Sequence, residues 1–179
     1  KEKKAVSAYY ASVAYMDAQV GKILSTLKEL ELEDDTIVIF TSDHGYHLGE
    51  KHRWAKHSLW ERATRVPLLI KVPGAENGIV SKPVGLIDLY PTLADLCGLD
   101  IPTQLDGNSV KPLLDGGKKP WRHSVLSLYG RGNISLRSER YRYIRYADGA
   151  EELYDMQADP NEWANLCFPE IEPHMQPVV

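Results

Sequence analysis

The sequence has 179 residues, of which 43% are hydrophobic and 26% charged, and these proportions are typical of a soluble globular protein with a sizeable core. Its net charge of -4 gives no indication of nucleic-acid binding, and no apolar run approaches the roughly 20 residues that a membrane-spanning helix needs. The sequence starts at Lys1 without an initiator Met or a signal-like segment, which is compatible with a processed piece or a fragment of a longer protein.

A long helix is predicted near the start, roughly from Val6 to Leu30, because apolar residues recur at three- and four-residue steps and form one stripe. The residues of this stripe are Val13, Met16, Val20, Ile23, Leu24, Leu27 and Leu30. After a turn, the β-branched apolar run from Ile37 to Phe40 is typical of a strand that is buried on both faces. The order of helix, turn and strand predicts an α/β layer.

The polar turn after this strand puts Asp43 and His44 side by side, followed by Gly45. Ligands of open α/β sheets bind beyond the carboxyl ends of the strands, so a carboxylate and an imidazole here are well placed to hold a cation. Two adjacent ligands require a turn, which Gly45 can supply. Ca²⁺ takes six to eight ligands and Mg²⁺ about six, so the others must come from elsewhere. On residue types alone, ordinary turn and capping duties remain the alternative.

Further polar residues surround this turn. Lys56 follows a glycine-containing loop and could meet an anion held by the cation, or it could snorkel between Trp54 and Trp60. Three histidines invite a zinc interpretation, but their spacing matches no closed zinc pattern, which favours a polar rim or a surface loop. They are His47, His52 and His57.

Two carboxylates nearby, Glu50 and Glu61, are candidate general bases. Glu61 is better explained as a partner of Arg65 at helical spacing. The stretch from Arg65 to Gly74 is predicted as a second buried strand, with Pro67 at its start.

A shorter helix is predicted from Leu89 to Cys97, with Asp88 as its N-cap and Gly98 as its end. Cys97 is expected to be a small buried hydrophobe. A glycine- and lysine-rich linker at 116–120 divides the predicted α/β part, residues 1–120, from residues 121–179, which are predicted to form a small antiparallel β subdomain with an extended tail.

Four short strands are predicted in this second part, at 124–129, 133–137, 141–146 and 151–154, with a hairpin signal at Asp148–Gly149. The arginines from Arg131 to Arg145 could form an anion-binding patch, or they could lie on a solvated strand face.

A set of sequence blocks goes beyond these generic signals and runs in order over nearly the whole chain. The blocks are Tyr9–Asp17, Thr41–Glu50, Trp54–Lys56, Ala63–Pro67, Leu89–Leu93, Leu105–Ser109 and Glu152–Pro160, followed by Glu162 and Asn165–Leu166. Together they resemble the C-terminal half of type I sulfatases, in the alkaline phosphatase superfamily, and most closely the iduronate-2-sulfatase-like branch. The resemblance implies an α/β fold: the C-terminal part of an alkaline-phosphatase-like sandwich, plus a small antiparallel sheet.

The resemblance also implies a function, the metal-dependent hydrolysis of sulfate esters, with sulfated carbohydrates as the expected substrates. Asp43 and His44 match metal ligands of the family, with Ca²⁺ as the expected cofactor and Mg²⁺ as the alternative. Lys56 matches the lysine that contacts the substrate sulfate and stabilises the charge that develops in catalysis. Tyr46 and His47 fall where this branch places substrate-binding residues. Relatives are commonly exported or lysosomal, so a periplasmic, extracellular or lysosomal location is expected.

The nucleophile of such enzymes is a formylglycine made from Cys or Ser in a Cys/Ser-x-Pro-x-Arg motif, and no such motif occurs here. Cys97 has no matching residues after it, and Cys167 has Ile171 where Arg belongs. We therefore expect an N-terminal half or another subunit to supply the formylglycine and the first pair of metal ligands. By itself, this chain is expected to be inactive.

Two alternatives remain open. Phosphonate or phosphate monoester hydrolases of the same superfamily share an Asp-His-Gly block, although Trp54–Lys56 and the later blocks favour sulfate. The other alternative is a non-catalytic α/β module that packs on a partner chain, because a sheet without all its strands leaves edges that seek pairing.

Overall fold

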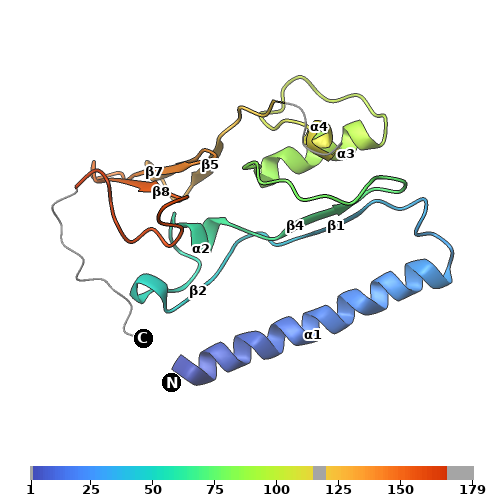
Figure 1. The fold of residues 1–179 in the computed structure, drawn as a ribbon, viewed down its shortest axis with the longest axis horizontal. Helices are drawn as coiled ribbons and strands as arrows, with labels where there is room; N and C mark the ends of the chain where they lie inside the picture. Colours follow the sequence, from blue (N-terminus) through green and yellow to red (C-terminus); the bar gives the residue numbers. More distant parts are fainter. Residues whose placement is uncertain (1, 115–119, 169–179) are drawn as a thin grey trace.

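The computed structural model describes residues 2–114 and 120–168, and within them it shows a long helix, two antiparallel strand pairs and a four-stranded sheet (Figure 1). The helices are α1 (Glu2–Glu29), α2 (Glu61–Thr64), α3 (Leu89–Leu96) and α4 (Lys111–Leu114), with 3₁₀ turns η1 (Glu50–His52) and η2 (Leu86–Asp88). The strands are β1 (Val38–Thr41), β2 (His47–Leu48), β3 (Trp54–Ala55), β4 (Leu68–Lys71), β5 (Val125–Leu128), β6 (Ile134–Arg137), β7 (Tyr141–Arg145) and β8 (Glu151–Asp155). The predicted linker residues 116–119 and the tail from 169 onward lie outside the described residues. None of the described helices is long and apolar enough to cross a membrane.

α1 confirms the first predicted helix, although it begins earlier, at Glu2, and it runs as a rod alongside the rest of the described chain (Figure 1). None of its residues is buried, and Ile23 of the predicted apolar stripe is 63% exposed. A ring contact between Tyr9 and Tyr46, with centroids 5.4 Å apart, joins the helix to the site loop. The apolar stripe is therefore present but largely exposed within the described residues, with Val20 and Leu27 half-buried.

β1 and β4 form an antiparallel pair, with Val38 opposite Lys71 and Thr41 opposite Leu68. Both predicted strands are present, but every residue of β1 is only half-buried, and β4 alternates between half-buried and exposed residues. The predictions that the first strand is buried on both faces and that the second is buried are therefore wrong for the described chain. The reason is that α1 buries no residue against this pair, and β4 is the one strand that pairs with β1 among the described residues.

α3 confirms the second predicted helix, and Gly98 ends it with a left-handed φ of 68°. Cys97, however, is exposed, so the expectation that it is a buried hydrophobe is wrong. The helix has already ended at Leu96, and the side chains that it buries lie earlier. They are Pro91, Thr92 and Ala94.

Asp88 occupies the predicted N-cap position of α3, but its side chain makes no capping hydrogen bond to this helix. Its buried carboxylate accepts two backbone hydrogen bonds, from the N–H of Gly85 and from the N–H of Asn108, both at 2.8 Å. Asp88 thereby fastens the segment before α3 to the loop after it, because a buried carboxylate needs donors and these two supply them.

Trp121, at the predicted start of the second part, packs with residues of the first. Its Nε1 donates to the carbonyl oxygen of Pro83 at 2.9 Å, and its ring lies in a small core with Val110 and Leu113. The side chain of Trp121 therefore belongs to the packing around α4.

The strands β5 to β8 form an antiparallel sheet in chain order, as predicted. The turn between β7 and β8 uses Gly149 at a φ of 90°, which confirms the hairpin signal. One face of this sheet packs Ile144 and Tyr154 against Leu59, from the segment that follows Lys56. The sheet is thus the support behind the loop that carries the predicted site.

Candidate metal and anion site

The turn after β1 brings together the two residues that were predicted as metal ligands. Oδ2 of Asp43 lies 3.6 Å from Nε2 of His44. The Asp43 side chain is 82% exposed and that of His44 is 33% exposed, so both are open to solvent. The two side chains converge, as two ligands of one cation must.

The His44 ring is oriented by its own backbone. Nδ1 lies 2.8 Å from the carbonyl oxygen of Gly45, which can only accept, so Nδ1 is the donor. In the neutral ring, Nε2 then carries the lone pair, and a hydrogen bond of this kind is the usual way to orient a metal-binding histidine. Nζ of Lys56 lies 2.9 Å from this Nε2 and donates to it. An imidazole lone pair, an ammonium group and the nearby Asp43 carboxylate thus meet at one point.

A short ribbon returns the chain from the turn to Lys56. β2 pairs with β3, with His47 opposite Ala55, and Lys56 follows β3 directly. Ala55 has a left-handed φ of 70°, an unusual angle for a residue with a side chain, and such angles often occur at functional sites. The snorkelling alternative for Lys56 is not supported, because Lys56 is exposed and the cations over the Trp60 ring are Lys51, with Nζ 4.4 Å from the centroid, and Arg53, with Cζ 6.0 Å from it.

Gly45 is required for a close approach rather than for a special backbone angle. Its N–H donates to the carbonyl oxygen of Ala63, in α2, at 2.8 Å. A Cβ atom at this position would collide with the carbonyl oxygen of Arg62 and lie 2.8 Å from that of Arg65. The turn that carries His44 is therefore seated directly on the backbone of α2.

The two residues predicted to bind substrate lie in different surroundings. Tyr46 is 39% exposed and packs beside Tyr9. His47 is 1% exposed, with its Nε2 2.8 Å from Oγ of Ser58 and its ring edge-on to Trp60. Burial lowers the pKa of His47, so its ring is neutral near pH 7. Substrate contact by either residue stays a prediction, and the structure gives His47 a supporting position behind the loop.

The remaining polar residues around the loop have their own partners. The ring of His57 lies 5.8 Å from that of Tyr129, and Oε2 of Glu50 accepts the N–H of Leu48 at 2.7 Å. No group of three or more metal-binding side chains gathers within residues 2–114 and 120–168, so the zinc interpretation has no support there.

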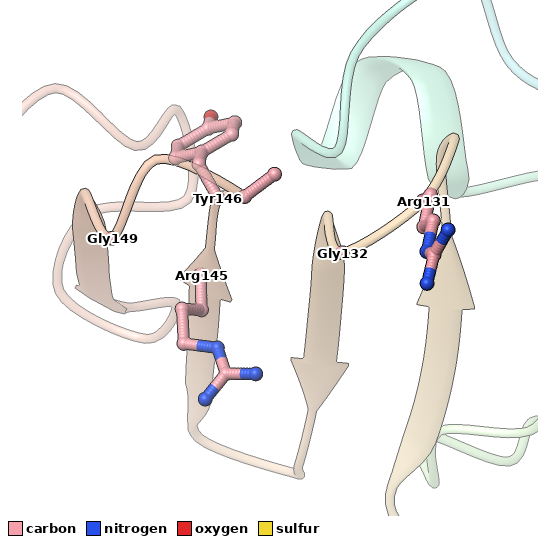
Figure 2. A pocket seen from close by; sticks show the side chains of 6 residues that line it. Arg131, Gly132, Arg145, Tyr146 and Gly149 are labelled. Carbon is pink, nitrogen blue, oxygen red and sulfur yellow. The ribbon is translucent and has the colours of Figure 1, made fainter.

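Two of the predicted arginines line a pocket of about 470 Å³ at one end of the four-stranded sheet. Figure 2 shows Arg131 beyond β5 and Arg145 at the end of β7, with Gly132 between them in this view. Neither guanidinium group pairs with a carboxylate of the described chain. Two other arginines of the predicted patch do not contribute, since Arg140 pairs with a carboxylate of β8 and Arg142 is buried.

A buried cluster of charges, formed by Arg142, Glu61 and Glu162, was not predicted. Arg142 donates a hydrogen bond to Glu61, and its Nε lies 2.8 Å from Oε1 of Glu162. Glu61 therefore has another cationic partner besides the predicted Arg65, whose Nη1 lies 3.8 Å from Oε1 of Glu61. The available signal was the period of two in β7, which puts Arg142 on the same face as Ile144. The sequence interpretation placed this arginine with its exposed neighbours instead.

Comparison with known proteins identifies the family. The protein-family model described as Sulfatase matches residues 1–99, more than half of the chain. The chain belongs to the sulfatase family. A sulfatase of Formosa agariphila is 39% identical over 164 residues, which cover 91% of this chain and 32% of that protein. Human arylsulfatase K is 38% identical over 193 residues, covering 96% of this chain and 35% of that protein. The chain thus spans about a third of the length of the curated relatives it matches.

Solved structures agree with this assignment. The structure of BT4656 in complex with D-glucosamine-2-N,6-O-disulfate matches with a TM-score of 0.76 and 30% identity, over 87% of this chain and 34% of that one. A phosphonate monoester hydrolase of Agrobacterium radiobacter matches with a TM-score of 0.76 and 31% identity, over 88% of this chain and 36% of that one. The sulfatase resemblance and the alkaline-phosphatase-like α/β fold are confirmed, while the iduronate-2-sulfatase-like branch stays a prediction.

Proposed function

We propose that this chain supplies part of the metal and sulfate site of a sulfatase, and that the complete protein hydrolyses sulfate esters of carbohydrates. Asp43 and His44 are the proposed ligands of a divalent cation, Ca²⁺ or alternatively Mg²⁺. Lys56 is the proposed sulfate-binding catalytic residue, and Tyr46 and His47 are proposed substrate-pocket residues. One observation carries the proposal: the Asp43 carboxylate, Nε2 of His44 and Nζ of Lys56 converge on one turn.

The chemistry of this turn fits a hard divalent cation. Asp43 offers carboxylate oxygens, and the bond from His44 Nδ1 to the carbonyl oxygen of Gly45 leaves Nε2 as a ligand atom. A bound cation would stabilise the negative charge that develops on sulfate oxygens during attack. A lone pair serves one partner at a time, so Lys56 can turn its three N–H donors to the sulfate when Nε2 holds a metal. The formylglycine nucleophile is proposed to lie outside this chain.

A carbohydrate substrate is supported by two features. One solved relative holds a glucosamine disulfate. The pocket lined by arginines also lies near the Lys56 loop, because Tyr129, two residues before Arg131, packs on His57. Guanidinium groups without acidic partners are suited to a second anionic group on an extended sulfated sugar.

The exposed apolar surfaces support a requirement for further polypeptide. The apolar stripe of α1 is largely exposed, β1 pairs with one strand within the described residues, and the chain covers only 32% of the Formosa agariphila relative. We propose that the polypeptide with the remaining ligands and the nucleophile packs against these surfaces. Intact-mass detection of formylglycine in the complete protein would support this account, whereas its absence would favour the alternative of a non-catalytic partner-binding module.

The function is tested by comparing turnover of an aryl sulfate, an aryl phosphate and a phosphonate monoester by the complete protein. Sulfate turnover is expected to dominate, to disappear with a chelator and to return with Ca²⁺. Faster turnover of the phosphonate monoester would favour the second candidate, a phosphonate monoester hydrolase, which a solved neighbour supports. Turnover of none of the three would contradict both enzymes. An exported or lysosomal location stays a prediction.

A further inference from the structure

The buried charged cluster ties the C-terminal sheet to the segment beneath the candidate site. Arg142 and Glu162 are each 2% exposed. Nη1 of Arg142 donates to Oγ of Ser135 at 2.8 Å and to the carbonyl oxygen of Leu59 at 3.2 Å, and Nη2 donates to Oε2 of Glu61. Nε of Arg142 lies 2.8 Å from Oε1 of Glu162. Both Nη atoms of Arg142 are therefore hydrogen-bonded, whereas Nε and Oε1 of Glu162 form an ion pair by distance without hydrogen-bond geometry. Leu59 precedes α2 and Glu61 is its first residue.

Glu162 also supplies a cap that α2 lacks locally. Trp60 occupies the N-cap position and makes no side-chain hydrogen bond to the helix. Oε2 of Glu162 accepts the backbone N–H of Glu61, the first residue of α2, at 2.8 Å, across 101 positions of sequence. A helix of four residues has little stability of its own, so α2 depends on this cap and on the cluster around it.

The turn with the candidate site contacts the C-terminal end of α2. The carbonyl oxygen of Ala63 holds the N–H of Gly45, and the contact leaves no room for a Cβ atom at Gly45. The turn with Asp43 and His44 must therefore follow any displacement of α2, because nothing compressible lies between them.

We propose that Arg142 and Glu162 are positioning residues for the candidate site. They fix α2, and α2 fixes the turn that presents His44 to Lys56. Neither residue touches the proposed metal or substrate, so their effect is transmitted through backbone contacts. The effect on turnover rests on the proposed function, whereas the mechanical coupling does not.

Two substitutions at Glu162 separate the effect of its hydrogen bond to the N–H of Glu61 from the effect of its charge. Glu162→Ala removes the acceptor for the N–H of Glu61 and leaves the Arg142 cation with one partner fewer in a buried place. Glu162→Gln keeps an oxygen that can accept this N–H, while it removes the charge and puts an amide NH₂ group in place of the oxygen that faces Nε of Arg142. Glu139→Ala is the matched control, because the Glu139 side chain is exposed and pairs with Lys82 rather than with a residue of the buried cluster.

The experiment is hydrogen–deuterium exchange with mass spectrometry on the complete protein and these variants, read in the peptide that covers residues 41–48. Glu162→Ala is expected to accelerate exchange in this peptide about tenfold, because the Gly45 N–H loses its fixed acceptor. Glu162→Gln is expected to stay within about twofold of wild type, and Glu139→Ala to match it. Should Glu162→Ala fail to fold, Arg142→Lys, which keeps the charge but cannot reach all the partners, is measured in the same peptide with the same expectation.

Activity provides the second readout. Glu162→Ala is expected to lower kcat for an aryl sulfate about tenfold with a nearly unchanged KM, and Glu162→Gln to restore most of it. Faster exchange in residues 59–65 with unchanged exchange in 41–48 would overturn the inference, since the cluster would then hold α2 without holding the turn. If the wild-type protein does not hydrolyse the sulfate, the proposed function fails, and the exchange result still decides the coupling.

Discussion

Two clusters of charged side chains in the described part of this chain, one around Arg142 and one around Lys56, differ in what surrounds them. Around Arg142, both the cation and the Glu162 carboxylate are 2% exposed, and the guanidinium group is hydrogen-bonded through both Nη atoms and ion-paired through Nε. Around Lys56, the Asp43 side chain is 82% exposed, and Nε2 of His44 accepts a hydrogen bond from the exposed lysine. A sealed, charge-paired cluster fixes structure, whereas a cluster that keeps ligand atoms open to solvent is available for chemistry.

Residue types alone do not distinguish a structural cluster of charges from a functional one. Each cluster contains at least one carboxylate and one cation, and α2 lies between them. Glu162 of the sealed cluster accepts the N–H of Glu61, the first residue of this helix, and Gly45, next to His44 of the open cluster, donates to the carbonyl oxygen of Ala63. Substitutions in each cluster can therefore test whether the cluster around Arg142 serves stability and the cluster around Lys56 serves turnover.

The largest effect is expected at the open cluster. Lys56→Ala should lower kcat/KM for an aryl sulfate by about 10³-fold, because it removes a preorganised donor for developing charge. Lys56 is exposed, so thermal unfolding should be nearly unchanged. Steady-state kinetics and a melting curve measure the two quantities. Near-normal turnover in Lys56→Ala would remove this residue from the site.

The sealed cluster should show the opposite pattern, a loss of stability first. Arg142→Met should destabilise the complete protein by about 3–5 kcal/mol, because the buried Glu162 carboxylate loses its cation and Glu61, which still pairs with Arg137, loses one of its partners. The control Glu139→Gln, at an exposed ion pair, should cost no more than about 0.5 kcal/mol. Denaturant unfolding of both variants provides the comparison, and equal midpoints would mean that the cluster is not sealed in solution.

The pH dependence of stability gives the next effect. Burial raises the pKa of Glu162 to about 7, more than the attraction of Arg142 lowers it. A carboxyl group with a raised folded pKa contributes stability that is fully present below its ordinary value of 4.5 and is lost as pH rises through 7. Wild type should therefore lose up to about 3 kcal/mol relative to Glu162→Gln between pH 4.5 and pH 7. Urea unfolding at both ends of this range measures the difference, and a pH-independent difference would contradict the shifted pKa.

The smallest effect is expected at the pocket of Figure 2. The double variant Arg131→Gln and Arg145→Gln should raise KM for a disulfated sugar about tenfold, since each guanidinium group is proposed to meet a second anionic group. Turnover of a small aryl sulfate should not change, and it serves as the internal control. An equal KM for the disulfated sugar in both proteins would leave these arginines as a solvated surface.

The parts of the fold that could be predicted are those with local signals. The strands from Val125 to Asp155 follow from alternation and turn residues, and Gly149 closes its hairpin as expected. The placement of Asp43 and His44 beyond β1 could also be predicted, because a strand end and its turn lie within a few residues. The stripe of α1 was recognised, but a periodic pattern does not indicate what packs on it, and none of its residues is buried.

The parts that could not be predicted depend on distant contacts. Glu162 caps a helix 101 positions away, and no pattern in sequence encodes that distance. Gly45 looks like a turn glycine, yet its lack of a side chain serves the contact with α2. Predicting the burial of Arg142 requires knowledge of which face of β7 meets Leu59 and Glu61. The two-residue alternation of side chains along the strand does not decide this by itself.

The affinity of the complete protein for Ca²⁺, measured by isothermal titration calorimetry on wild type and on Asp43→Asn and His44→Ala, tests the central claim most directly. The account predicts one site whose Kd rises at least about 100-fold in each variant, because each loses a ligand atom of the cation. A Kd that is the same in all three proteins would contradict the assignment of the turn after β1 as a metal site.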